Sequence, residues 1–233
     1  MQTNNKNHIR QMVAVGVFVA LSYICCVLFH FKASFLSFDL KDAVMTIGAM
    51  FFGPMAGLVT VLITCLIEFA TISGTGVYGL IMNLLSSITF VCIGSLVYTQ
   101  KRSMGGALAG MIAATVVMVA VMMGANLLVT PYYMGTSPAD VAAIIPTLLL
   151  PFNLTKGIFN SAVVFLLYKP VSQALKASGF VKNGAATVTS MAPVPPQVRK
   201  KRSMIVMLCA FVVAIATLLY FFLSLQGSFS LWE

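Results

Sequence analysis

Long apolar runs separated by short polar segments make up most of the chain. Because a helix rises about 1.5 Å per residue, roughly 20 apolar residues are needed to cross the hydrocarbon core of a bilayer. Five runs meet this requirement, and each predicts one transmembrane helix: 11–29, 77–98, 105–129, 147–168 and 204–224. The pattern therefore predicts an all-α integral membrane protein.

The apolar run 42–72 is too long for one comfortable span. Gly53 and Pro54 interrupt it, and this dipeptide breaks or turns a helix. The run is therefore either one kinked helix or two short helices, 42–52 and 55–72.

Positive charges distinguish these alternatives, because cytoplasmic loops carry an excess of Lys and Arg. Lys6 and Arg10 place the N-terminus inside the cell. Two short helices also place Lys101 and Arg102 inside, whereas one kinked helix would place them outside. The sequence therefore predicts six core helices, with both ends of this core in the cytoplasm and with outer segments at 30–41, 73–76 and 130–146.

The composition changes after the sixth core helix. Residues 1–177 are expected to form a six-helix membrane domain, and 178–203 are rich in Pro, Ser, Gly, Ala and Thr, which is typical of a flexible cytoplasmic linker. Residues 204–233 are expected to add a seventh transmembrane helix, an appended anchor, and a short outer tail. This count places the C-terminus outside the cell.

The composition excludes several other classes of protein. The chain is 60% hydrophobic and 8% charged, whereas a soluble domain carries about 25% charged residues. The net charge of +9 comes mostly from basic residues at the ends of apolar runs, which favours contact with the lipid bilayer and gives no basis for a nucleic-acid partner. Five cysteines lie inside apolar runs without metal-ligand spacing, so neither a metal site nor a cofactor is expected.

Some polar residues lie where the bilayer makes them costly. A Lys at the centre of a span costs roughly 2.5–3.5 kcal/mol, so Lys156 needs either a partner or a purpose. Its ammonium either extends to the outer headgroups or, together with Asn153 one turn earlier, contacts a ligand. Asn83 and Asn126 each fit interhelical hydrogen bonding or ligand contact.

The acidic residues allow further interpretations. Asp42 is interpreted as a capping residue at the start of its helix. Glu68 is expected to pair with either Lys41 or Lys156, and the sequence leaves this open.

Amides, cations and carboxylates thus gather toward the outer face of several helices. This set suits a neutral, polar, aromatic or amphipathic small molecule bound from outside. Catalysis is not indicated, since the sequence contains no Walker A loop, HExxH, GxSxG or cluster of carboxylates for Mg²⁺.

Several of these motifs resemble one known family. PFNLTKG at 151–157 and the pair FDLKDA and FGPMAG within 38–57 are similar to the substrate-binding S components of energy-coupling factor (ECF) vitamin importers, most of all to riboflavin-specific subunits. The resemblance implies a membrane subunit without ATPase activity, a transmembrane coupling subunit (T component) and two cytoplasmic ATPase subunits as partners, and riboflavin as the ligand. The site residues that it implies are Asp39, Gly79, Asn83, Asn126, Asn153 and Lys156.

Two other functions remain open at this stage. One is an S component for another vitamin or for flavin mononucleotide, although no Arg lies on the outer side to bind a phosphate. The other is a lipid-modifying membrane enzyme, which would need clustered acids or His; in the sequence, His8 and His30 are not near any acids.

Gly16 and Ala20 in the first helix are four residues apart and therefore lie on one face. Small residues at this spacing let another helix approach closely. That helix belongs either to the same chain or to the coupling subunit, and the family resemblance favours the coupling subunit.

Overall fold

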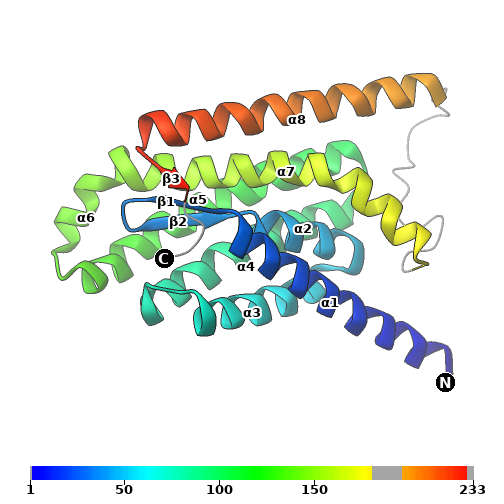
Figure 1. Cartoon of the computed structure of the whole chain (residues 1–233), viewed down its shortest axis with the longest axis horizontal. Coiled ribbons are helices and arrows are strands. Elements are labelled where there is room, and N and C mark those ends of the chain that lie inside the picture. The colour runs from blue at the N-terminus through cyan, green and yellow to red at the C-terminus, as the bar shows by residue number, and fades with distance from the viewer. Residues whose placement is uncertain (1, 180–195, 230–233) are drawn as a thin grey trace.

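The computed structural model describes residues 2–179 and 196–229 (Figure 1). In chain order the elements are α1 Gln2–Leu28, β1 His30–Ala33, β2 Leu36–Asp39, α2 Lys41–Phe52, α3 Pro54–Thr71, α4 Gly76–Gln100, α5 Met104–Met134, α6 Pro138–Ile144, the π-helical turn η1 Ile145–Leu149, α7 Leu150–Ala177, α8 Pro196–Ser224 and β3 Ser228–Phe229.

Among the described residues, six helical segments are long and apolar enough to cross a membrane. They are Ile9–Leu28, Pro54–Thr71, Gly76–Gln100, Met104–Met134, Pro138–Leu175 and Met204–Ser224. The predicted all-α membrane bundle is therefore confirmed. The helix α2 is not in this set because it has 12 residues and a length of about 18 Å.

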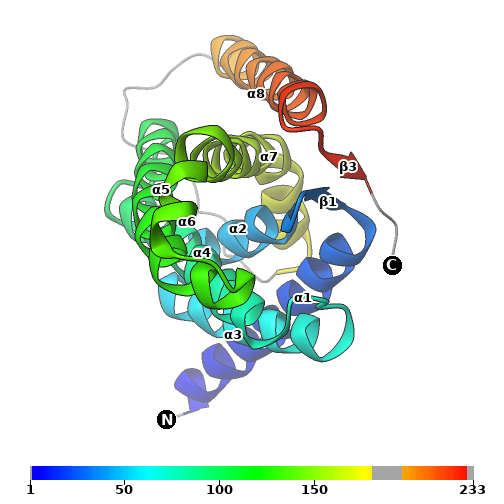
Figure 2. The ribbon, with the colours of Figure 1, turned by 90° about the vertical axis from the view of Figure 1, so that its left-hand side faces the viewer.

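The apolar run 42–72 forms two helices, as the charge argument predicts. Gly53 separates them with φ of 97°, a conformation that favours glycine, and Pro54 occupies the first turn of α3. Seen end-on, α2 lies inside the ring formed by α1, α3, α4, α5 and α7 (Figure 2). Residues 41–50 of α2 are all buried. This helix is therefore the centre of the core.

The outer segments are more ordered than the sequence pattern indicates. Residues 30–39 form an antiparallel hairpin, in which β1 pairs with β2. The helix α5 passes Pro131 and ends at Met134, where Gly135 caps it in the left-handed conformation. The N–H of Gly135 donates to the carbonyl of Pro131 within this cap. A short turn then leads from α5 to α6.

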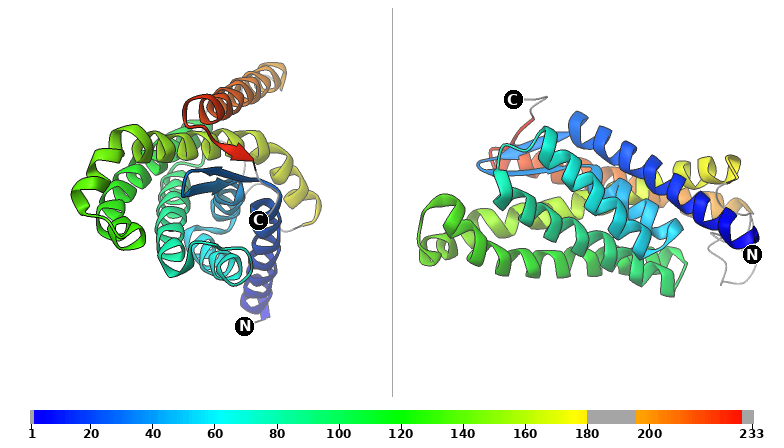
Figure 3. Two further views of the ribbon diagram at one scale, coloured as in Figure 1. Left: turned by 60° about the vertical axis from the view of Figure 1, so that its left-hand side comes forward. Right: turned by 90° about the horizontal axis from the view of Figure 1, so that it is seen from below.

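The seventh predicted helix, α8, packs along α7 on the outer side of the ring (Figures 2 and 3). It begins at Pro196, earlier than the apolar stretch from Met204, because the preceding basic run is also helical. After α8 the chain returns to the bundle, and β3 pairs antiparallel with β1, so the strand order is β2-β1-β3. Most of the expected linker, 180–195, lies outside the described residues.

The helices α4 and α5 approach each other at two glycines. A Cβ added to Gly110 would lie 2.8 Å from the carbonyl oxygen of Gly94, which belongs to the backbone and has little freedom to move. Glycine at position 110 therefore sets how closely these two helices pack.

We predict that Gly110→Ala lowers the free energy of unfolding by about 1–3 kcal/mol, because the added methyl group pushes α4 and α5 apart. The matched control is Gly124→Ala in the same helix, where no described atom lies within 4 Å of the new Cβ. Thermal unfolding of both variants in one detergent measures the difference. Equal midpoints would contradict this account of the helix contact.

Candidate ligand site

A cavity lies between the β1–β2 hairpin and the helices α3, α4, α5 and α7. It holds about 910 Å³ of space, including its opening to solvent. Its lining combines apolar and aromatic side chains with a few charged and amide groups, which is typical of small-molecule sites.

All six residues that the family resemblance implicates line this one cavity. Asp39 comes from β2, two residues come from α4, one from α5 and two from α7. These are Asp39, Gly79, Asn83, Asn126, Asn153 and Lys156. Residues up to 117 positions apart thus meet at one site because the helix ends converge beneath the hairpin.

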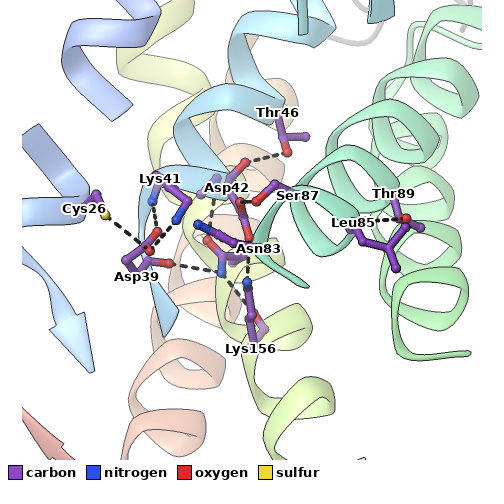
Figure 4. Close-up of polar contacts among 12 residues, drawn as sticks. Cys26, Asp39, Lys41, Asp42, Thr46, Asn83, Leu85, Ser87, Thr89 and Lys156 are labelled. Carbon is purple, nitrogen blue, oxygen red and sulfur yellow. Dashed lines mark hydrogen bonds and ion pairs between the residues drawn. The ribbon is translucent and has the colours of Figure 1, made fainter. Parts of the chain in front are cut away.

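A network of buried charges forms one wall of the cavity (Figure 4). The Nζ atom of Lys41 lies 2.9 Å from Oδ2 of Asp39 and 2.6 Å from Oε2 of Glu68. The Lys41 side chain is only 1% exposed. Asn83 donates a hydrogen bond from Nδ2 to the same oxygen of Glu68 at 2.7 Å. The question left open by the sequence is thereby answered, since the partner of Glu68 is Lys41.

A second buried ion pair joins α2 to α7. Nζ of Lys156 lies 3.2 Å from Oδ2 of Asp42, and the Oγ of Ser87 donates to Oδ1 of the same carboxylate at 2.5 Å. The interpretation of Asp42 as a capping residue is therefore corrected: Asp42 lies in the first turn of α2, but its carboxylate binds Lys156 and Ser87, and the N-cap position of this helix makes no side-chain capping hydrogen bond. Lys156 is also buried and points inward, so its charge is stabilised by Asp42 and not by the outer headgroups.

Charge governs the ionisation of Asp39. Burial by itself would raise the pKa of Asp39, but the ammonium groups of Lys41 and Lys156 and the hydrogen bonds from Lys41 hold this pKa below its ordinary value. Asp39 is therefore an anion at neutral pH, and its carboxylate is already bound to Lys41.

Carboxylates and a thiol come close together at the same place. Donor atoms of Cys26, Asp39 and Glu68 lie within 4.8 Å of one another. The ammonium of Lys41 contacts both carboxylates and supplies the compensating positive charge. This arrangement is an ion-pair network, and it gives no basis for a metal site.

Two asparagines are held in fixed orientations before any ligand binds. Asn126 donates from Nδ2 to the carbonyl of Met122 at 2.7 Å and accepts from Thr130 at 2.8 Å. Asn153 donates from Nδ2 to the carbonyl of Leu149 at 2.8 Å. Such preorganisation reduces the entropy that a bound ligand would otherwise cost.

Aromatic side chains complete the mouth of the cavity, and no sequence pattern predicted them. Phe35, at the tip of the hairpin, lies 6.2 Å from Tyr133 of α5, measured between ring centroids, and Tyr133 lies 6.4 Å from Tyr78 of α4. All three line the cavity.

A histidine and an acid that are separated in the sequence lie together in the structure, contrary to the expectation that no His lies near an acid. His30 is paired with Asp39 across the hairpin, and Asp39 and Glu68 share one Lys. Burial lowers the pKa of His30, so the imidazole is neutral at pH 7.

Residues 10–168 match the sequence family described as "ECF transporter, substrate-specific component". The chain belongs to this family. It is therefore a substrate-specific subunit of a membrane transporter and not an enzyme, and it is an S component of the type that works with a T component and an ATPase module.

Two further comparisons agree with this class. The chain is 29% identical over 181 residues to the riboflavin transporter RibU of Staphylococcus aureus (strain TCH60). The aligned residues cover 74% of this chain and 95% of that protein. It is also similar to a solved structure described as the S component of a bacterial ECF transporter. The TM-score is 0.63 at 26% identity, over 72% of this chain and 99% of that chain. The family match ends at residue 168, so α8 and β3 lie beyond it.

We predict that Lys41→Met lowers the free energy of unfolding by about 3–5 kcal/mol, because it removes the cation that directly binds the buried carboxylate of Asp39 and the partly buried carboxylate of Glu68. The double variant Lys41→Met/Glu68→Gln should recover part of this loss, since it also removes one of the two anions. Thermal unfolding of the three proteins in one detergent checks this. A double variant as unstable as Lys41→Met would show that the Lys41–Glu68 contact contributes little.

Proposed function

We propose that this S component binds riboflavin with high affinity at the extracellular face and delivers it to an ATP-driven importer, formed with a T component and two cytoplasmic ATPase subunits. The observation that carries this proposal is the convergence of Asp39, Gly79, Asn83, Asn126, Asn153 and Lys156 on one cavity. The similarity to the RibU transporter supports the choice of vitamin.

The chemistry of the cavity suits a flavin. Its lining combines aromatic rings, among them Tyr78, Tyr133 and Phe152, with fixed amides at Asn126 and Asn153. Aromatic rings pack against a flat tricyclic ring system, and amides hydrogen-bond to its polar edge and to a ribityl chain.

The balance of charge favours the neutral vitamin over its phosphate ester. The two buried ammonium groups, Lys41 and Lys156, are outnumbered by three carboxylates, Asp39, Asp42 and Glu68, which leaves one net negative charge. A phosphate brings about −1.5 to −2 further charge at pH 7. No Arg lines the described cavity to offset it.

The proposed orientation places the hairpin end of the bundle outside the cell. The hairpin, which lines the cavity, and the end of α8 share this end. The turn after α4, which carries Lys101 and Arg102, lies at the opposite end (Figure 1). The positive-inside rule then gives a cytoplasmic N-terminus and an extracellular C-terminus. In this arrangement, residues 1–177 are the substrate-binding domain, 178–203 a cytoplasmic linker and 204–233 an additional span.

Asn153→Ala and Lys156→Ala should each weaken riboflavin binding roughly 10- to 100-fold, because removing one partner of a buried hydrogen bond costs about 1–3 kcal/mol. Quenching of flavin fluorescence during titration measures the dissociation constant, and the melting midpoint shows whether each variant is folded. The matched control is Leu154→Ala on the same helix, whose side chain is 43% exposed and faces away from the cavity.

The same titration tests the choice of ligand. Flavin mononucleotide should bind at least tenfold more weakly than riboflavin, for the charge reason given above. Folded protein that binds neither flavin would contradict the proposed ligand, and unchanged affinity in both variants would place the binding site elsewhere.

The face for the T component is proposed on α1. Gly16 and Ala20 are exposed, and no described atom lies within 4 Å of a Cβ built on Gly16, so no described segment of this chain occupies the groove. The helix α8 packs on α7 and leaves this face open (Figure 3). Close helix packing of this kind drives association within lipid.

Gly16→Trp should therefore abolish both ATP-driven riboflavin uptake and co-purification with the T component, while riboflavin binding to the solitary protein is retained. Gly124→Trp is the matched control, because Gly124 is also exposed on a membrane helix and also has no described atom within 4 Å of its added Cβ. Loss of uptake in both variants, or loss of binding in Gly16→Trp, would contradict docking on this face.

A further inference from the structure

The helix α8 and strand β3 lie beyond the family match, yet they contact the wall of the cavity. Phe221 of α8 has no exposed surface. Its ring centroid lies 5.0 Å from that of Phe38 and 6.1 Å from that of Phe31, one residue on each hairpin strand. It also lies 6.5 Å from Phe152, which lines the cavity. A helix that served only as an anchor would not need this contact.

The backbone forms a second connection between the same elements. After α8, the N–H of Gly227 donates to the carbonyl of Phe221 at 3.1 Å and turns the chain back toward the bundle. A Cβ on Gly227 would collide with the Phe221 ring, so glycine is needed for this close approach. Ser228 then pairs with Lys32, which makes β1 the central strand of the sheet.

The hairpin held in this way supplies part of the cavity itself. Phe35, Leu36, Ser37 and Asp39 all line it, and Phe35 reaches Tyr133 on the opposite side of the mouth. A ligand that enters or leaves past the hairpin needs the hairpin to move. Contacts that hold the hairpin on its side away from the cavity therefore slow the exchange of ligand by this route.

We propose that α8 and β3 form a brace that holds the hairpin against the cavity, and that Phe221 is the positioning residue that transmits this support. The brace makes the exchange of ligand slow in both directions. This inference rests on the proposed function for its choice of ligand, and on the described contacts for its mechanism.

The brace predicts a specific change in kinetics. If the released hairpin is a minor state through which the ligand must pass, weakening the brace raises the population of that state and raises the association and dissociation rates by the same factor. The dissociation constant then changes little. If Phe221 only shaped the pocket, the dissociation rate alone would rise and affinity would fall.

Stopped-flow quenching of riboflavin fluorescence on the full chain tests this. Phe221→Ala should raise both rate constants at least tenfold, which corresponds to about 1.4 kcal/mol. Phe211→Ala should leave both unchanged; it is the matched control, because the same ring is removed from the same helix at a position that is 53% exposed. Equal rates in the two variants, or a rise in the dissociation rate alone, would overturn the brace.

A second variant tests the brace in the opposite direction and does not depend on removing a core side chain. Residues paired across antiparallel strands have Cα separations of about 4.5–5.5 Å, which a disulfide can span. Lys32→Cys/Ser228→Cys, oxidised to link β1 to β3, should slow both rates, and a reductant should restore them. Unchanged rates in protein with a confirmed cross-link would overturn the proposal.

Amide hydrogen exchange of residues 30–39 separates this inference from the choice of vitamin, because it needs no ligand. It should be faster in Phe221→Ala than in Phe211→Ala and slower in the cross-linked protein. Protein that binds no riboflavin but shows these exchange differences contradicts the proposed function and supports the brace. Exchange that is equal in all of these proteins overturns the brace whatever the ligand.

Discussion

Charge that is buried inside a membrane protein has to be paired within the protein, and this requirement organises the structure. The side chains of Lys41 and Lys156 are almost fully buried, so each ammonium needs carboxylates within a few ångströms. These carboxylates come from different elements: Asp39 from β2, Asp42 from α2 and Glu68 from α3. The pairs therefore fix the hairpin, α2, α3 and α7 relative to one another at the level of the cavity.

One neutral side chain connects the two ion pairs. Asn160 of α7 accepts a hydrogen bond from the N–H of Ala43 at 3.1 Å and donates to the carbonyls of Asp39 at 3.3 Å and Lys156 at 3.1 Å. The start of a helix leaves backbone N–H groups without partners, and α2 starts inside the protein. Asn160 satisfies one of them and joins the corner between β2 and α2 to α7. The short, buried α2 is tolerated because its polar end is satisfied in this way.

This dependence on distant contacts explains what the sequence could and could not predict. The long apolar runs and the break at Gly53 are local signals, and they predicted the helices of the bundle and the division of 42–72 correctly. The hairpin was missed because residues 30–39 were interpreted only as part of an outer segment between two helices, whereas they form strands by pairing with each other and with β3. Asp42 was assigned to its own helix end because its true partner, Lys156, is 114 positions away in the sequence, and only packing brings the two together.

The helix α2 connects the proposed docking face on α1 with the wall of the cavity. Phe18, on the buried side of α1, packs against α2 so closely that a Cβ on Gly48 would lie 2.8 Å from its ring, and its centroid lies 6.1 Å from that of Phe52. The same α2 carries Lys41 and Asp42 at its other end. A displacement of α1 by a partner therefore acts on the rigid helix that holds the charges of the cavity wall. Because interiors are close-packed, such a displacement is passed on to the helices that α1 contacts, which are α2, with its ion pairs, and α3.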